Sequence, residues 1–369
     1  MRYIPETALE PLFPNVDIRV AEARYKVQLE LPGTSTLRPS DIERICAIAT
    51  WDQDPGELSD RPEGGRGVVF DREEPIEKHG LSLGGVLVSG IGYRTGEVGS
   101  RSVGRFTSEG MQPPSSGNFM DSIRDNGVMC TTYAVGRRIV NDVPSYSPLG
   151  TYTTARVKNK VKKTQAINAR NPIDPVVPHI EAYGRFIDDD LADEDGHFGF
   201  VVIPVPHSEQ ARLGRDMEVH LTTGLSVGND VWIDPGITRL MHSLRHLHEE
   251  VGYAHLQAHL SNLYPVDGRT YMVDWSTSRR LPGNGFESDY NKAVDVGVPY
   301  MSMTDLLWSI NNGELRPGFN QLGNEIMIML LNAYTDGNIP TNARIRGLVT
   351  SGGKSFNTER LLEILREHS

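Results

Sequence analysis

The residues best suited to chemistry lie in one polar segment, YAHLQAHLSNLYPVDGRTYMVDW, which spans residues 253–275. Asn262 follows His255 by seven positions, and Asp274 follows Asn262 by twelve, with an Asp-Gly turn between them. An amide and a carboxylate on the two arms of a hairpin offer oxygen ligands to Mg²⁺, the ion that bridges nucleotide phosphates during phosphoryl transfer. Asn262 and Asp274 are therefore candidate residues for a metal site.

The same segment contains candidate groups for proton transfer. In ATP-using kinases the catalytic loop carries His, Asp and Asn in this order, and a metal-binding Asp follows a short hairpin. Here His255, Gln257 and Asn262 occupy the loop positions, and Asp274 occupies the last one. Gln257 thus replaces the catalytic carboxylate. Two alternatives remain open: His259 acts as a base near neutral pH, or positioning alone supplies most of the rate.

A second set of motifs lies upstream, in VSGIGYRTGEVGS, SIRDNGVMCTTYAVG and TYTTARVKNKVKK. These segments resemble the N-lobe of the selenoprotein O family, whose kinase-like members transfer AMP from ATP to protein hydroxyls. GVMCTT matches the family's G-I-P-T-T, and GYAH resembles its G-F-C-H. The resemblance covers about residues 85–275 in pieces. It implies a two-lobed kinase-like fold that uses ATP and Mg²⁺, with Asn262 and Asp274 as the metal ligands.

The resemblance also implies roles for upstream residues. Asp125 stands where the family has its Glu and would orient a basic partner or a second metal. Arg156 falls on the family's T-R-V, and Lys163 follows seven positions later, so both would hold phosphates. Residues 151–164 are expected to form a strand that runs into a basic cluster. Alternation along that strand would give one basic face, suited to a phosphate pocket or to a solvated edge: Arg156, Lys158, Lys160 and Lys162.

Two departures from the family pattern concern charge. Ser89 falls on the lysine of the family's L-K-G, and a serine cannot replace a cation on a phosphate. Ser261 falls on the family's Asp before the metal-binding Asn, so neither version of the catalytic carboxylate is present. The missing cation could come from an arginine of the glycine-rich segment, although a solvated hairpin explains these arginines equally well: Arg94, Arg101 and Arg105.

The composition restricts the class of protein. The chain has 369 residues, of which 38% are hydrophobic and 23% charged, as in ordinary globular proteins. Its net charge of -11 argues against a nucleic-acid partner, and no apolar run predicts a membrane span. The first residues do not predict a signal peptide. Two cysteines, Cys46 and Cys130, make no disulfide framework, so a cytoplasmic location is expected.

The order of expected elements predicts an α+β protein. Strands dominate up to Met217, with one early helix at residues 39–51. Apolar residues at helical spacing then predict helices at 237–256, 303–310, 324–334 and 358–369. We expect an N-terminal extension at 1–60, a β-rich N-lobe at 61–216, a hinge at 217–224 and a helical C-lobe at 225–369.

The sequence therefore predicts a divergent transferase that moves phosphoryl or AMP from ATP to a hydroxyl of a protein, peptide or small molecule. The first alternative is a pseudokinase that binds a ligand or partner without chemistry, which the residues at Ser89, Gln257 and Ser261 favour. The second is a zinc hydrolase, because several histidines are spaced four apart: His242 and His246, and His255 and His259, with His248 between the pairs. No HExxH motif accompanies them.

Overall fold

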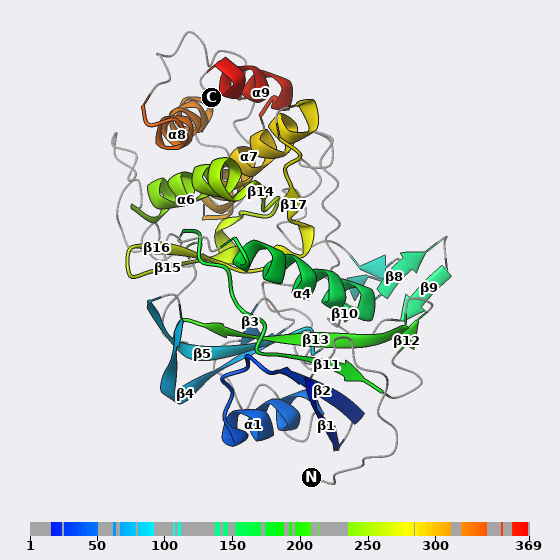
Figure 1. The fold of residues 1–369 in the computed structure, drawn as a ribbon. Coiled ribbons are helices and arrows are strands. Elements are labelled where there is room, and N and C mark those ends of the chain that lie inside the picture. The colour runs from blue at the N-terminus through cyan, green and yellow to red at the C-terminus, as the bar shows by residue number, and fades with distance from the viewer. Residues whose placement is uncertain are drawn as a thin grey trace. The chain divides into compact units, whose positions relative to one another are not determined.

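A computed structural model of the chain describes residues 16–23, 26–50, 62–63, 67–78, 80–91, 106–107, 110–111, 137–140, 143–146, 152–170, 174–187, 192–193, 196–207, 213, 235–283, 285–310, 319–337, 348–349 and 356–367. The fold is mixed α and β, as the sequence predicts (Figure 1). The chain forms two compact units. Unit 1 comprises Met1–Gly117, Thr132–Gln165 and Pro178–Glu209, and unit 2 comprises Asn118–Thr131, Ala166–Val177 and Gln210–Ser369.

Unit 1 is built on a curled antiparallel sheet, of which nine strands lie in the described residues. Seven of them follow the order β1-β2-β11-β13-β5-β4-β3, and the short strands β10 and β12 both pair with β13. The bounds are β1 (Val16–Glu22), β2 (Lys26–Pro32), β3 (Pro62–Glu63), β4 (Gly67–Lys78), β5 (Leu81–Ser89), β10 (Tyr152–Thr153), β11 (Ala182–Phe186), β12 (Ala192–Asp193) and β13 (Gly196–Val205). Two separate hairpins join β6 (Phe106–Thr107) to β7 (Gly110–Met111) and β8 (Arg137–Val140) to β9 (Val143–Tyr146).

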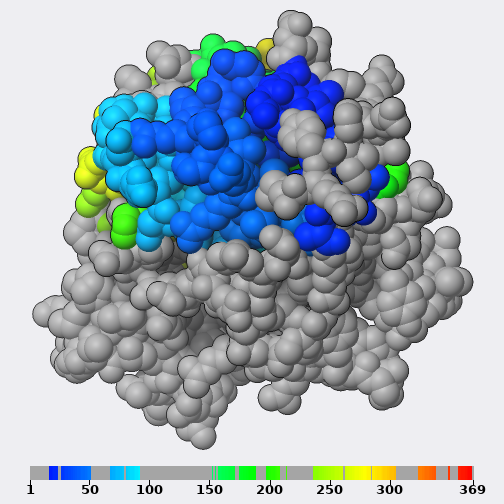
Figure 2. All heavy atoms as spheres, turned by 90° about the horizontal axis from the view of Figure 1, so that it is seen from below, coloured from blue at the N-terminus to red at the C-terminus, as the bar shows by residue number. Residues whose placement is uncertain are grey.

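Helix α1 (Pro39–Ala49) covers one face of this sheet, and the sequence predicts this helix at residues 39–51. Ile45 and Ile48 are fully buried in a cluster that includes Leu29 and Phe200 of the sheet. Burial of each such side chain contributes about 1.5–3 kcal/mol, so this layer is a main source of stability for unit 1. Figure 2 shows the outer surface of the layer, where the blue and cyan residues of β1, β2, α1, β4 and β5 form one continuous patch.

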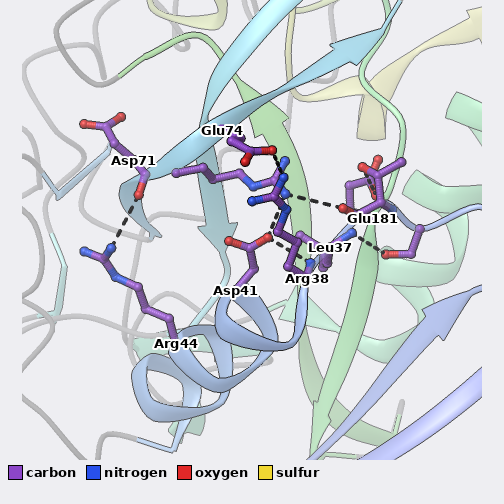
Figure 3. A network of polar contacts seen from close by, with 10 residues as sticks. Leu37, Arg38, Asp41, Arg44, Asp71, Glu74 and Glu181 are labelled. Carbon is purple, nitrogen blue, oxygen red and sulfur yellow. Dashed lines mark hydrogen bonds and ion pairs between the residues drawn. The ribbon is translucent and has the colours of Figure 1, made fainter.

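A polar network joins the start of α1 to β4 and to the segment before β11 (Figure 3). The backbone N–H of Arg38 donates to the Asp41 carboxylate at 2.9 Å, which closes the first helical turn. The Arg72 guanidinium lies 2.8 Å from the same carboxylate, and both side chains are nearly buried. Lys78 of β4 forms an ion pair with Glu181. These charges are paired with each other, and the Arg72–Asp41 ion pair links α1 to β4 of the sheet.

The basic segment forms a helix, and the strand expected for residues 151–164 is wrong beyond Thr153. Helix α4 spans Thr154–Asn168 and lies in Figure 1 on the face of the sheet opposite α1. The reason is a second periodicity in the same residues, because the buried side chains of Val157, Val161 and Thr164 recur every three to four positions. Alanine, lysine and glutamine also favour helix, and this preference wins over the short basic alternation.

Unit 2 is mainly helical. Its bounds are α6 (Pro235–His246), a π-helical turn (Leu247–Val251), β14 (Tyr253–Ala254), β15 (Leu263–Val266), β16 (Arg269–Met272), β17 (Arg279–Arg280), α7 (Phe286–Ile310), α8 (Phe319–Tyr334) and α9 (Thr358–Glu367), with short 3₁₀ turns at Leu260–Asn262 and Trp275–Thr277. The helix predicted at 237–256 ends early, because Gly252 has φ +72° and terminates it. The helix predicted at 303–310 is the last part of α7.

Residues 1–60 contribute two strands to the main sheet, since β2 pairs with β11 from Tyr183–Glu30 to Phe186–Val27. The expected hinge at 217–224 lies outside the described residues, and the lobe boundaries stay a prediction. Among the described residues, no helix has both the length and the apolar character needed to cross a membrane.

Candidate functional site

The hairpin β15–β16 of unit 2 brings Asn262 and Asp274 to its base. The paired residues nearest the base are Leu263 and Met272, and beyond them the Val273 N–H donates to the Asn262 carbonyl at 2.9 Å. Asn262 therefore lies opposite Val273, one residue before Asp274. The antiparallel pairing of β15 with β16 thus brings together two residues that are twelve positions apart in the sequence, as the predicted hairpin requires.

The Asn262 side chain is buried and held by its amide nitrogen. Nδ2 lies 3.1 Å from the Gln257 carbonyl and 2.8 Å from His259 Nε2. Because a carbonyl only accepts hydrogen bonds, the nitrogen must face it, and Oδ1 points the other way. Oδ1 makes no hydrogen bond with the described residues. The amide oxygen that a hard cation prefers is therefore available.

The backbone of Asp274 is left-handed, with φ 60° and ψ 59°. This conformation costs a non-glycine residue about 1–2 kcal/mol, although aspartate tolerates it better than most. The Ser276 hydroxyl donates to Asp274 Oδ1 at 3.0 Å, which orients the carboxylate. Such strain gathers at functional sites, where surrounding contacts hold it in place. One carboxylate and one amide oxygen fit the limited protein ligand set that Mg²⁺ uses beside phosphates and water.

The His255 imidazole, which is fully buried, links the two arms of this site. Its Nε2 donates to the Val273 carbonyl at 2.9 Å, and its Nδ1 accepts the Gln257 N–H at 3.2 Å. The ring also contacts Trp275 edge to face at 4.5 Å. Burial lowers the pKa of His255, against the opposing effects of the Asp295 and Asp274 carboxylates. His255 thus holds Val273, the residue before Asp274, and Gln257, the residue at the catalytic position of the kinase pattern.

Asp295 of α7 fixes the backbone of the loop that contains His255 and Leu256. Its fully buried carboxylate accepts the N–H groups of His255 and Leu256, each at 2.5 Å, and lies 3.0 Å from His248 Nε2. Leu256 has φ 63°, a rare conformation for leucine. A left-handed residue lets successive backbone N–H groups point at one anion. The hydrogen bonds to the Asp295 carboxylate therefore offset the backbone strain at Leu256. The Tyr334 hydroxyl completes the chain at 2.7 Å from His248 Nδ1, and burial raises the pKa of that hydroxyl.

Gln257 is held at both ends of its backbone, by His255 and by Asn262. Its side chain is 7% exposed, and Oε1 is buried with no hydrogen-bond partner among the described residues. A buried acceptor without a partner costs about 1–3 kcal/mol unless a ligand supplies the donor. His259 stands differently, because its Nε2 lone pair is engaged by Asn262. A base role for His259 requires that hydrogen bond to break.

The upstream candidate residues lie partly within the described residues. Ser89 ends β5, is buried, and shares a 2.7 Å hydrogen bond with the Tyr152 hydroxyl. Arg156 and Lys163 both lie on α4, where Lys163 is half-buried and the Arg156 side chain is outside the described part. The remaining candidates fall outside the described residues: Asp125, Arg94, Arg101 and Arg105.

The histidines do not form a zinc site in the part of the chain that is described. No cluster of three or more His, Cys, Asp or Glu residues able to hold a metal occurs there. Both ring nitrogens of His248 and of His255 are engaged within the interior. His242 is exposed, with Asp336 at 3.9 Å.

Sequence reasoning missed Asp295 and Tyr334, which support the loop, and it named His248 only as a possible zinc ligand. The available signal was an aspartate inside an apolar helical run, KAVDVGVPYM, since charged residues are rarely buried without partners.

No family model matches the chain, and no curated protein matches it either.

Proposed function

We propose that this chain is a divergent kinase-like transferase that uses ATP and Mg²⁺ to modify a hydroxyl of a protein, peptide or small molecule. The observation that carries the proposal is the hairpin base, where Asn262 Oδ1 has no hydrogen-bond partner among the described residues and Asp274 follows the residue opposite Asn262 with a left-handed backbone. The motif resemblance and the order of a β-rich and a helical unit support a two-lobed kinase-like fold. A cytoplasmic location remains part of this proposal.

The residues present fit Mg²⁺-nucleotide. Asn262 Oδ1 and an Asp274 oxygen would hold the ion, which supplies charge neutralisation on the phosphates. The strained backbone at Asp274 is supported by Ser276 and by the His255–Val273 hydrogen bond, so the carboxylate is preorganised before the ligand binds.

Gln257 would bind the substrate hydroxyl that is to be modified. Its unpartnered Oε1 can accept a hydrogen bond from the substrate hydroxyl and orient it, although an amide does not take up the proton. Phosphoryl transfer with a loose transition state depends mainly on positioning and charge, so a fixed amide suits this role. The proton then leaves to water, or to His259 once that ring releases Asn262.

The proposal is tested by Mg²⁺-ATP binding to the full chain, measured by calorimetry. Asp274→Asn keeps a side chain that tolerates left-handed backbone but removes the charge, and we expect affinity to fall about tenfold or more. Asp267→Asn is the matched control, because Asp267 is also left-handed, at φ 45°, and lies exposed at the hairpin tip. Equal affinity in both variants, or no binding by the unmodified chain, contradicts the proposal.

A catalytically inactive ligand-binding protein is the second candidate, because Gln257 and Ser261 provide no carboxylate and His259 is engaged by Asn262. Incubation with ATP labelled at the α- or the γ-phosphate, with candidate protein and small-molecule acceptors, separates the two. Transfer of either label excludes the inactive protein, and the label that moves identifies AMP or phosphoryl transfer.

A further inference from the structure

Unit 2 contains a polar hollow among helices α6, α7, α8 and α9, which Figure 1 shows grouped together. Its empty volume is about 440 Å³, with the open mouth included. Pockets for apolar ligands are lined mainly by hydrophobic side chains, whereas this wall is mostly charged, so it suits a small ionic ligand. The charged side chains that line it in the described part of the chain are Arg245, Glu249, Asp289, Lys292 and Arg366.

Two ion pairs use four of these five charges. Arg366 Nε donates to Asp289 at 2.7 Å. Arg245 Nε donates to the Glu249 carboxylate at 3.1 Å, and its Nη1 donates to Asp336, which is 63% exposed. The Nη2 group of Arg245 makes no hydrogen bond within the described residues. One face of a fixed guanidinium therefore remains available to a ligand.

Lys292 of α7 is the fifth charge of the wall. The residue is half-buried, and its ammonium forms no ion pair or hydrogen bond with the rest of the described chain. The described wall thus has three cations for two carboxylates. A partly buried charge is screened less than an exposed one, so this ammonium attracts an anion into the hollow. Lys292 and Arg245 Nη2 supply the donors that an oxyanion requires.

Tyr334 connects the hollow to the loop that carries the candidate site. It lines the hollow, and its hydroxyl lies 2.7 Å from Nδ1 of the buried His248. Nε2 of the same ring lies 3.0 Å from Asp295, which fixes the backbone of the loop. The π-helical turn Leu247–Val251 contributes to both regions, because it supplies Glu249 to the hollow and His248 to the hydrogen bonds behind the loop.

We propose that this hollow binds a small oxyanion through Lys292 and Arg245, and that the bound anion stabilises the loop through Tyr334. The ligand is a small molecule with a phosphate or carboxylate group, whose oxygens accept from an ammonium and a guanidinium. Binding selects the positions of α7 and α8 that also bring the Tyr334 hydroxyl to His248, so the anion favours the closed loop. The inference does not rest on ATP binding, because loop order is measured without nucleotide.

The first experiment measures binding by nuclear magnetic resonance at the amides of Tyr334 and Thr335 in the labelled full chain. Inorganic phosphate or acetate is titrated at constant ionic strength, because salt screens unspecific attraction. Lys292→Met should weaken the binding about tenfold, as for loss of one charged hydrogen bond. Arg280→Met, a matched loss of charge at an exposed position of unit 2, should leave it unchanged. Melting curves check that both variants fold.

The second experiment measures amide exchange at His255 and Leu256, whose N–H groups donate to Asp295. We expect the anion that binds more tightly to slow this exchange severalfold in the unmodified chain. Tyr334→Phe keeps the ring in the wall but removes the hydroxyl, so exchange there should not respond to the anion. The amide shifts of Thr335 establish whether Tyr334→Phe still binds it.

Each outcome decides one part of the inference. Equal weakening in Lys292→Met and Arg280→Met would show general charge attraction and overturn the site, as would no response to either anion at high millimolar concentration. Binding that requires Lys292 but leaves exchange unchanged would keep the site and overturn its link to the loop, and so would slowed exchange that persists in Tyr334→Phe. Because no readout involves ATP, failure here leaves the Asp274→Asn experiment to decide the proposed function.

Discussion

The two units satisfy their buried carboxylates in different ways. In unit 1, Glu30 accepts from the Arg185 guanidinium at 2.7 Å, and both side chains are nearly buried in the sheet. In unit 2, Asp295 instead accepts two backbone N–H groups and faces an imidazole. A carboxylate paired with a cation ties neighbouring strands together. A carboxylate that collects N–H groups dictates the shape of a loop, and this is the loop that carries the candidate site.

The largest expected effect comes from removing the loop anchor. Asp295→Ala leaves two N–H groups and an imidazole without their acceptor, and breaking a buried polar cluster in this way costs about 3–5 kcal/mol of unfolding free energy. Urea unfolding measures the loss, and amide exchange at His255 and Leu256 reports whether the loop opens. Asp289→Ala on the same helix is the control, since its pair with Arg366 is partly exposed and contributes at most about 1 kcal/mol. Equal losses in the two variants would contradict the distinction.

A smaller effect is expected from the pair in the sheet. Arg185→Met leaves Glu30 buried with Gln28 as a remaining donor at 3.1 Å, so we expect a loss of about 3 kcal/mol. The double variant Glu30→Gln with Arg185→Met removes both charges and should recover at least half of the loss. A double-mutant cycle by urea unfolding checks this, and strict additivity would show that the two charges do not act as a pair.

The pH dependence of unit 2 is expected to come partly from His255. Burial lowers its pKa in the folded state, so below about pH 6.5 the unfolded chain binds more protons and stability falls as the pH falls. One proton changes the unfolding free energy by at most about 1.4 kcal/mol per pH unit. Urea unfolding at pH 5 and pH 7 should show a steeper loss for the unmodified chain than for His255→Gln, whose amide still donates to Val273. Identical pH profiles would contradict the prediction.

The smallest expected effect concerns Cys46, whose thiol should not react with an alkylating reagent in the folded chain. Burial raises the pKa of Cys46 in the unit 1 core to about 11, so almost no thiolate forms at pH 8. Iodoacetamide followed by peptide mapping should leave Cys46 unmodified in the folded chain and label it in urea. Rapid labelling without denaturant would show that the α1 layer opens more readily than its burial indicates.

The sequence predicts best where its signals are local. The strand-rich first part of the sequence indicated the main sheet, helical spacing at residues 39–51 indicated α1, and an Asp-Gly turn indicated the hairpin that joins Asn262 to Asp274. The basic segment misled the strand prediction, because lysines at every second position coincide with valines at helical spacing.

The remaining features depend on contacts distant in sequence. Asp295 lies about 40 positions from the N–H groups that it accepts, and the left-handed backbone of Leu256 has no signal in a leucine residue. The pairing of β2 with β11 joins residues more than 150 positions apart, and the ion pair between Glu30 and Arg185 spans 155 positions. Register and long-range pairing are decided by the assembled interior, which local propensity does not report.

The β15–β16 hairpin also offers an experimental handle. Its tip, Asp267 and Gly268, is exposed and left-handed, while the base is held by the ladder and by the Val273–Asn262 hydrogen bond. Loop closure entropy rises slowly with length, so a few added residues at the tip cost about 1 kcal/mol or less. A fluorophore or an affinity peptide placed there would report from the arm that carries the candidate ligands and leave the positions of those ligands unchanged.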